Sequence, residues 1–276
     1  MKINGDTRVF GIIGNPVNHS LSPAMHNAAF AELGINGVYV PFLTEDVAGA
    51  VNGVRALSID GLSVTIPHKE AVLAHLDEVD QTARRIGAAN TIVVSRRGSA
   101  ASLQGCNTDW LGANHALGRH LTLAGSRAVI LGAGGAARAI GFGLKKAGAD
   151  IEIWSRTEST GTTLATELGC PWQPLTEPPE KEFDILINAT AVGMHPNQQL
   201  SPLPANVLTR FSVVMDIIYA PLHTTLLREA ADAGCTCIDG LEMLLYQGVV
   251  QFELWTGCTA PVDTMRAALR RAAGVV

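Results

Sequence analysis

The feature that most constrains the fold of this chain is a series of short apolar runs, each as long as one β-strand, separated by stretches with helical periodicity. This alternation predicts parallel sheets covered by helices, because parallel strands need a crossover connection and a helix usually provides it. Runs such as 128–131, apolar at every position, are typical of strands buried on both faces. The predicted strands are 9–13, 38–42, 62–66, 91–94, 128–131, 151–154, 185–188 and 213–217. The sequence therefore indicates the α/β class.

Local signals place several helices and one loop. Ser22 stands directly before a proline, which predicts that Ser22 is the N-cap of a helix over 23–33. From residue 241 onwards the pattern is helical with one break at 258–261, and this predicts two terminal helices. The proline-rich stretch 171–179 is predicted to be a surface loop, since proline cannot donate to a strand ladder.

Length and composition exclude several classes of protein. A chain of 276 residues favours two domains, and 47% apolar against 16% charged residues is sufficient for two cores. A net charge of −5 without a dense Lys/Arg run argues against nucleic-acid binding. There is no long apolar segment and no apolar signal core at the N-terminus, so we expect no membrane association and a cytoplasmic location. Five cysteines without a C-x-x-C pair predict reduced thiols and no metal site.

A glycine-rich turn follows the predicted strand 128–131 and opens a helical pattern, which is the context of a dinucleotide-binding turn. Gly132 permits the tight turn, Gly134 lets the backbone approach a pyrophosphate, and Ala137 occupies the close-packed third position. Free amides at the start of the helix attract the anion. An ordinary glycine-rich turn between strand and helix is the alternative. The predicted cofactor-binding residues of this turn are Gly132, Ala133, Gly134, Gly135 and Ala136.

The end of the next strand indicates which dinucleotide binds. Strand 151–154 is followed by Ser155, Arg156 and Thr157, where an NAD-binding protein has an acidic residue for the ribose hydroxyl. A guanidinium at this place suits a 2′-phosphate, because its planar fork pairs with two phosphate oxygens. We therefore predict NADP, with NAD as a weaker alternative. The other interpretation is that Arg156 is a solvated residue at a strand end.

Further polar motifs follow other predicted strands and turns. They are Ser20-Leu-Ser22-Pro23, Val64-Thr65-Ile-Pro67-His68-Lys69, Gly87-Ala-Ala-Asn90-Thr91, Gly105-Cys-Asn107-Thr108-Asp109-Trp-Leu-Gly112, Asn188-Ala-Thr190, Asp216-Ile-Ile-Tyr219-Ala-Pro221 and Asp239-Gly240-Leu-Glu-Met-Leu-Leu-Tyr-Gln247. Together with the glycine turn, these motifs resemble the shikimate dehydrogenase family in order and spacing over essentially the whole chain. The resemblance implies reversible NADP-dependent reduction of 3-dehydroshikimate to shikimate, a step of chorismate and aromatic amino-acid biosynthesis.

The resemblance also implies how the chain divides. Residues 1–107 would form an α/β substrate-binding domain, and residues 243–276 would return to it as its completing helices. Residues 108–242 would form a doubly wound, Rossmann-type NADP domain inserted between them. The small-molecule substrate would bind to a monomer or a homodimer.

Residue roles carried over from the family fall into two groups. Ser20 and Ser22 would hold the substrate carboxylate, with Tyr219 close to it. The residues expected to bind ring hydroxyls are Thr65, Asn90, Asp109 and Gln247. Contacts to the nicotinamide half of the cofactor would come from Asn188, Thr190, Ile217 and Gly240.

By the same resemblance Lys69 is the acid/base residue and Asp109 is its partner. The chemistry of ketone reduction agrees, because an ammonium group can stabilise the developing oxyanion and supply its proton. In the oxidative direction a neutral amine can take the alcohol proton. Asp109 is also expected to be the N-cap of the helix that follows it.

Two departures from the family pattern keep alternatives open. Thr160 stands where a second base is common in the family, and Glu158 adds an unfavourable charge, which predicts modest selectivity for NADP. Ser63 replaces a frequent asparagine, so a quinate/shikimate dehydrogenase with relaxed cofactor use, or an enzyme for an amino analogue, is an alternative. A non-catalytic regulator that senses cofactor or metabolite is another, although Lys69 and Asp109 are both present. An unrelated nucleotide-binding module would leave the other motifs unexplained.

Overall fold

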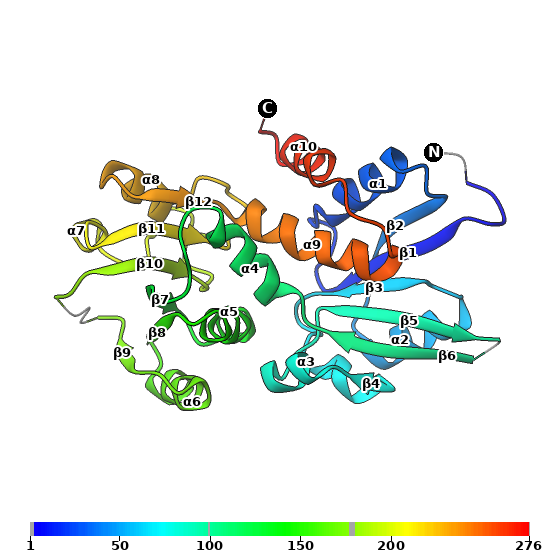
Figure 1. The fold of residues 1–276 in the computed structure, drawn as a ribbon, viewed down its shortest axis with the longest axis horizontal. Helices are drawn as coiled ribbons and strands as arrows, with labels where there is room; N and C mark the ends of the chain where they lie inside the picture. The colour runs from blue at the N-terminus through cyan, green and yellow to red at the C-terminus, as the bar shows by residue number, and fades with distance from the viewer. Residues whose placement is uncertain (1–2, 99, 177–179, 276) are drawn as a thin grey trace. The chain divides into compact units, whose positions relative to one another are not determined.

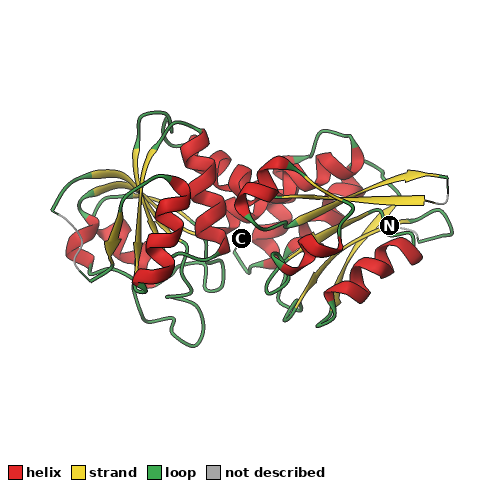
Figure 2. Cartoon of the chain, turned by 90° about the horizontal axis from the view of Figure 1, so that it is seen from below, coloured by secondary structure: helices red, strands yellow, loops and turns green. Residues whose placement is uncertain are grey.

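The computed structural model describes residues 3–98, 100–176 and 180–275, and the chain divides into two compact units (Figure 1). Unit 1 comprises Met1–Thr108 and Gln247–Val276, and unit 2 comprises Asp109–Tyr246. Each unit contains a six-stranded sheet with helices packed on it (Figure 2). Among the described residues, no helix combines the length and the apolar composition that crossing a membrane requires.

The sheet of unit 1 is mixed, with the strand order β2-β1-β3-β5-β6-β4. Its strands are β1 (Arg8–Gly14), β2 (Gly37–Leu43), β3 (Gly61–Val64), β4 (Glu78–Val79), β5 (Thr91–Arg97) and β6 (Ala100–Cys106). Strands β2, β1 and β3 run parallel, whereas β5 is antiparallel to both of its neighbours. The expectation of purely parallel strands was therefore wrong for this unit, because β5 and β6 follow each other directly without a crossover helix.

Helices cover both faces of the unit 1 sheet. They are α1 (Ser22–Glu32), α2 (Val47–Ala56), the 3-10 helix η1 (Ala71–His75), α3 (Gln81–Ile86), the unit 1 part of α9 (Gly240–Thr256), and α10 (Val262–Ala272). Successive side chains of β1 point to opposite faces. Ile13 joins a core cluster with Val51 and Val54 of α2, while Phe10 packs on Phe30 of α1 and on Trp255 of α9. Both predicted terminal helices are confirmed as α9 and α10.

Unit 2 has an all-parallel sheet with the order β12-β11-β10-β7-β8-β9. Its strands are β7 (Arg127–Leu131), β8 (Asp150–Ser155), β9 (Trp172–Pro174), β10 (Phe183–Asn188), β11 (Phe211–Asp216) and β12 (Thr236–Ile238). Its helices are α4 (Asp109–Gly118), α5 (Gly135–Lys146), α6 (Glu158–Leu168), α7 (Ala205–Leu208) and α8 (Thr225–Asp232), with the first part of α9. Counted within the unit, the order is that of a doubly wound dinucleotide-binding sheet, which reverses between β7 and β10.

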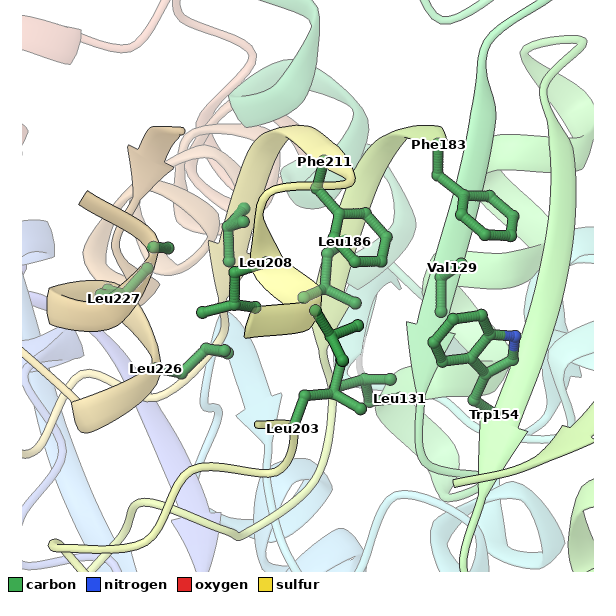
Figure 3. Packing of buried hydrophobic residues seen from close by; sticks show 13 residues of the cluster. Val129, Leu131, Trp154, Phe183, Leu186, Leu203, Leu208, Phe211, Leu226 and Leu227 are labelled. Atoms are coloured by element: carbon green, nitrogen blue, oxygen red, sulfur yellow. The ribbon is translucent and has the colours of Figure 1, made fainter. Parts of the chain in front are cut away.

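One core cluster of unit 2 shows why its strands are so apolar. Trp154 of β8 and Phe183 of β10 pack edge to face with ring centroids 5.6 Å apart (Figure 3). Leu226 of α8 and Leu131 of β7 belong to the same buried cluster. Side chains at the centre of this sheet meet helices instead of water, so the strands carry no alternating polar positions.

All eight predicted strands occur, but the structure adds four others and corrects one loop. The additions are β4, β6, β9 and β12, which are short or interrupted by polar residues. The predicted loop 171–179 was wrong at Trp172–Pro174, which pairs with β8 as the edge strand β9; residues 177–179 lie outside the described residues. An edge strand tolerates Pro174 at its end because one side of its ladder needs no donor.

Candidate functional site

The glycine turn of unit 2 lies between β7 and α5, at the point where the strand order reverses. Gly132 has a φ of +105°, and a Cβ there would lie 3.1 Å from the carbonyl oxygen of Ala189. Both the backbone conformation and this close contact therefore favour glycine. At Gly134 and Gly135 an added Cβ would meet nothing within 4 Å. Helix α5 begins there without a side-chain cap. No capping side chain therefore occupies its first amides, and the turn has room for a bound pyrophosphate.

Neighbouring residues of this turn support the same reading. Ala133 and Ala136 are half-buried within it, and Ala137 is fully buried one position further along α5. A small residue at position 137 lets the helix pack closely against the sheet. The turn therefore has the shape and the free amides of a dinucleotide cradle.

At the end of β8, Ser155 has a structural role, whereas the Arg156 side chain is available to a ligand. The Ser155 hydroxyl donates to the carbonyl oxygen of Thr157 at 3.0 Å and accepts a hydrogen bond from Trp172 Nε1 at 2.9 Å, so it holds the turn together. Thr157 is the N-cap residue of α6 and makes no side-chain cap bond. Arg156 is exposed and makes no hydrogen bond or ion pair with any residue the structure describes. Of these three predicted cofactor residues, Arg156 has the side chain that can reach a ligand.

Asn188 and Thr190, both predicted to contact the cofactor, fasten the loop after β10. The Asn188 oxygen accepts from the Thr190 amide at 3.0 Å and from its hydroxyl at 2.7 Å. The Asn188 nitrogen donates to the Val192 carbonyl at 3.2 Å and to Asp216 Oδ1 at 3.1 Å. All four hydrogen-bonding positions of the amide are thus used inside unit 2. This loop can offer a ligand its backbone more readily than these two side chains.

Asp216, at the end of β11, is a site-shaping residue to which we had assigned no role. It stands opposite Asn188 in the parallel register and is fully buried. Its carboxylate accepts from the Ile218 amide at 3.0 Å and from the Thr224 hydroxyl at 2.7 Å. Burial raises the pKa of Asp216, and these hydrogen bonds oppose the increase. The recurrence of a polar residue at the ends of two adjacent strands was the signal available in the sequence.

Three more predicted residues, Ile217, Tyr219 and Gly240, lie in the loop after β11 and at the start of α9. A Cβ at Gly240, the first residue of α9, would lie 2.5 Å from the carbonyl oxygens of Ile217 and Ile218, so only glycine allows this approach. Ile217 and Tyr219 are half-buried, and burial raises the pKa of Tyr219. The structure therefore brings Ile217 and Gly240 into contact within unit 2.

Lys69 lies in a turn of unit 1 whose backbone is held from several sides. The Thr65 amide donates to Ile13 O at 2.9 Å, and the Ala89 amide donates to Lys69 O at 2.8 Å. The buried ring of His68 donates from Nε2 to the carbonyl oxygen of Thr44 at 2.8 Å. A lysine at a fixed strand end is a suitable acid/base group, because proton transfer requires a defined geometry. Thr65 and Lys69 are both half-buried.

Ser20 and Ser22 lie together at the start of α1. The predicted N-cap role of Ser22 was wrong: the helix begins at Ser22, Leu21 is the N-cap residue, and the Ser22 amide donates to the Ser20 hydroxyl at 3.3 Å. Ser20 thus supplies the acceptor that we had expected from Ser22. The Ser22 side chain is buried and makes a weaker polar contact with the hydroxyl of Tyr39.

Asn90 and Gln247 meet in unit 1, although 157 residues separate them in the chain. Asn90 Nδ2 donates to Gln247 Oε1 at 3.3 Å, and both side chains are buried. Asp109 is the first residue of unit 2 and of α4, not the cap before that helix, and it is 6% exposed. The predicted N-cap role of Asp109 was therefore wrong by one position.

Several buried polar residues of unit 1 next to these side chains were not predicted. They are His26, Tyr39, Thr91, Thr108 and Gln251. Within the part of the chain that the structure describes, no group of three or more His, Cys, Asp or Glu side chains could hold a metal ion.

Comparison with known proteins identifies the family of a chain with this fold and these sites. Residues 12–92 match the model of the shikimate dehydrogenase substrate binding domain, and residues 240–270 match the shikimate 5'-dehydrogenase C-terminal domain. A shikimate dehydrogenase (NADP(+)) of Pyrococcus furiosus is 47% identical over 267 residues, which are 96% of each chain. This chain belongs to the shikimate dehydrogenase family.

Solved structures of the family share the fold over nearly the whole chain. A shikimate dehydrogenase in complex with NADP+ has a TM-score of 0.90 and 41% identity, covering 98% of this chain and 97% of that one. The Thermus thermophilus enzyme in complex with NADP(H) and shikimate has a TM-score of 0.88 and 41% identity, covering 96% of this chain and 100% of that one. The predicted fold class, a Rossmann-type domain with an α/β domain completed by C-terminal helices, is confirmed.

Proposed function

We propose that this chain is an NADP-dependent shikimate dehydrogenase, which reduces 3-dehydroshikimate to shikimate and catalyses the reverse oxidation on the route to chorismate. The observation that carries the proposal is the 41% identity to the Thermus thermophilus enzyme, whose crystal structure holds both NADP(H) and shikimate. The near-complete coverage of both chains means that the likeness extends to both units. Cytoplasmic location and a monomeric or homodimeric state stay predictions.

The two units have different tasks in this proposal. Residues 1–107 and 243–276 form the substrate-binding domain, and residues 108–242 form the NADP-binding domain. The two compact units, which meet at 108/109 and 246/247, support this division. The family model named for the substrate-binding domain matches residues 12–92, inside unit 1.

The cofactor site is the glycine turn with the end of β8. An added Cβ at Gly134 or Gly135 would meet nothing within 4 Å, and the amides of this turn would hold the pyrophosphate. The exposed guanidinium of Arg156 would pair with the 2′-phosphate. When bound, NADPH supplies the hydride. Ile217 and Gly240 lie together in unit 2, where the apolar Ile217 side chain would exclude water from the hydride path.

The substrate site is built from unit 1 side chains. Ser20 and Ser22 would bind the carboxylate at the start of α1, where helix amides also attract an anion. Thr65, Asn90 and Gln247 would bind the ring hydroxyls. A polyol requires several buried donors and acceptors, and the hydrogen-bonded pair Asn90–Gln247 provides such groups.

Lys69 and Asp109 would carry out the proton chemistry. As hydride adds to the carbonyl carbon of 3-dehydroshikimate, the Lys69 ammonium donates a proton to the carbonyl oxygen, which becomes the new hydroxyl. In the reverse direction the neutral Lys69 amine accepts that proton. Asp109 would orient the Lys69 ammonium and accept a hydrogen bond from a ring hydroxyl.

Steady-state kinetics with shikimate and quinate, each with NADP and with NAD, test the proposal. We expect the highest kcat/KM for shikimate with NADP. A higher value for quinate, or equal values for the two cofactors, would favour a quinate/shikimate dehydrogenase with relaxed cofactor use. Absence of turnover with all four pairs, while NADP still binds, would favour a non-catalytic regulator.

A further inference from the structure

The turn that carries Lys69 is fixed by backbone hydrogen bonds at both of its ends. At its start the Thr65 amide donates to the carbonyl oxygen of Ile13, in β1, at 2.9 Å. At its end the carbonyl oxygen of Lys69 accepts from the Ala89 amide, in the segment before β5, at 2.8 Å. The support of the middle of the turn, residues 66–68, then determines how closely the Lys69 backbone is held in place.

The middle of the turn has less backbone support than its ends. Pro67 has no N–H group, so it cannot donate a backbone hydrogen bond. The carbonyl oxygen of Ile66 accepts from the Asn15 amide at 3.0 Å, whereas the His68 amide donates at 2.9 Å to Thr65, within the turn itself. Ile66 and Pro67 are both exposed, so their side chains add little packing. A side chain that ties this segment to another element would therefore restrict it strongly.

His68 provides such a tie. It is 5% exposed, and its ring nitrogen Nε2 lies 2.8 Å from the carbonyl oxygen of Thr44, directly after β2. Because a carbonyl oxygen can only accept, Nε2 carries a proton and donates, in the neutral ring and in the imidazolium alike. The hydrogen bond therefore holds in both protonation states of the ring.

Thr44 is a suitable anchor because its own position is fixed. Its amide donates to the carbonyl oxygen of Gly14 at 3.3 Å, at the end of β1. Its hydroxyl donates to the carbonyl oxygen of Asp46 at 3.0 Å and accepts from the Asp46 amide at 3.1 Å. Asp46 is in turn the N-cap of α2, and its side chain accepts from the Gly49 amide at 2.8 Å. The His68 ring thus connects the turn to β2 and to the start of α2.

We propose that His68 is a positioning residue for Lys69, which holds the turn so that the Lys69 ammonium reaches the carbonyl oxygen of the substrate. The inference rests on the proposed function, in which Lys69 is the acid/base residue. The two residues are adjacent in the chain, so any rotation of the His68 backbone changes the direction of the Lys69 side chain. Proton transfer requires hydrogen-bond reach, and a misplacement of about 1 Å can cost about a hundredfold in rate. Loss of the tie should therefore lower turnover more than binding.

The test compares His68→Gln with His68→Met, two side chains of equal length, in the reduction of 3-dehydroshikimate by NADPH. The glutamine Nε2 is as many bonds from Cα as the histidine Nε2 and can donate to Thr44, whereas methionine has no donor. We expect His68→Met to lower kcat about tenfold or more and His68→Gln to keep it within about threefold of the wild type. Both KM values should change less than about threefold, because Thr65 is held to β1 by its own amide.

Two further variants complete the experiment. His120→Met, the same exchange at an exposed position after α4, is the matched control and should change no kinetic constant. His68→Asn decides the matter if His68→Met does not fold: its amide is one bond shorter than that of glutamine and does not reach the Thr44 carbonyl oxygen. We expect kcat of His68→Asn to fall as far as that of His68→Met.

The outcomes distinguish this inference from the proposed function. If the wild type is active and His68→Met and His68→Asn both retain its kcat, the positioning role is wrong and the function stands. A lower melting temperature with unchanged kcat would make His68 merely structural. Equal losses of kcat in His68→Gln and His68→Met would also reject the hydrogen bond as the cause. A wild type inactive with 3-dehydroshikimate and NADPH would overturn both proposals.

Discussion

Two asparagines beside strand ends show how the fold occupies an amide side chain. Asn188 uses all four of its hydrogen-bonding positions to fasten the loops after β10 and β11. Asn90 donates to the Thr108 hydroxyl at 3.0 Å and to Gln247 Oε1 at 3.3 Å, and its oxygen accepts from the Thr91 hydroxyl and the Thr108 amide. The family resemblance assigned both asparagines to ligand binding. The sequence could not show these internal hydrogen bonds, because their partners are brought together by the fold.

At Lys69 the decisive measurement is turnover. Lys69→Ala should lower kcat about a hundred- to ten-thousandfold and change both KM values much less, because the ammonium interacts most strongly with charge that develops in the transition state. Asp109→Asn should be milder, and the two losses should not add if the residues act as one unit. Lys145→Ala, an exposed lysine of α5, is the control. Near-normal kcat in Lys69→Ala would require another proton donor.

For Arg156 the prediction concerns cofactor choice. Arg156→Ala should raise the KM for NADP roughly ten- to a hundredfold, the cost of a charge-assisted hydrogen bond, and leave the KM for NAD nearly unchanged. Arg228→Ala on the exposed surface of α8 controls for the loss of a positive charge. Equal effects on NADP and NAD would reject a contact with the 2′-phosphate.

Among the elements, the apolar strands were predictable, whereas the strands that are very short or interrupted by polar residues were not. Strands such as β7 and β10 read as apolar runs because helices cover them on both faces. β6 reads Ala-Ala-Ser-Leu-Gln-Gly-Cys and owes its place to seven pairings with β5. β9 and β12 have three residues each, too few for a pattern to be visible. Pairing with a neighbour defines these elements, and pairing leaves little trace in local sequence.

The start of α9 gives a prediction at the scale of one element. Gly240→Ala should lower the melting temperature and the affinity for NADP, because the new Cβ would lie 2.5 Å from two carbonyl oxygens and would push α9 away from the loop after β11. The cost should be about 1–3 kcal/mol, as for other overpacked sites. Thermal unfolding and NADP titration measure the two effects.

Gly53→Ala within α2 is the matched control for that exchange. An added Cβ at Gly53 meets nothing within 4 Å, so the substitution should stabilise the helix by about 0.5–1 kcal/mol. If Gly240→Ala were as stable as the wild type, the close approach between α9 and the loop would not be a real constraint.

On the scale of the whole molecule, the length of the chain indicated two domains, and the family resemblance implied the return of the C-terminal helices. The sequence could not reveal the hydrogen bonds that Gln251 makes in unit 1, since Gln251 is 160 residues away from Thr91 and 188 from Ser63. Only the return of α9 to the N-terminal strands brings these side chains together. Helix α9 begins in unit 2 and ends in unit 1, because the boundary at Gln247 lies within it. Unfolding of unit 1 should therefore disturb unit 2 as well.

Because α9 belongs to both units, one buried histidine of unit 1 should determine the acid stability of the whole chain. His26 is fully buried and stacks on Tyr39 with ring centroids 4.5 Å apart. Neither of its ring nitrogens has a hydrogen-bond partner among the described residues. Burial lowers the pKa of His26 from 6.5 to about 3, and the nearby Gln251 opposes the decrease only in part. The folded protein therefore keeps this ring neutral at a pH where the unfolded chain protonates it.

Acid should therefore lower the free energy of unfolding through His26. Above pH 6.5 His26 is neutral in both the folded and the unfolded state, and the full stability is present. As pH falls toward about 3, the unfolded chain binds a proton at His26 that the folded protein does not bind. The loss is about 1.4 kcal/mol per pH unit at most, hence about 2 kcal/mol between pH 6.5 and 5. His26→Phe keeps the stacked ring and should remove this loss, as urea unfolding at pH 7.5 and 5 will show. His19→Phe, at an exposed position of unit 1, should retain the wild-type dependence. A His26→Phe variant that weakens as steeply as the wild type would mean that carboxylates, and not this ring, control acid unfolding.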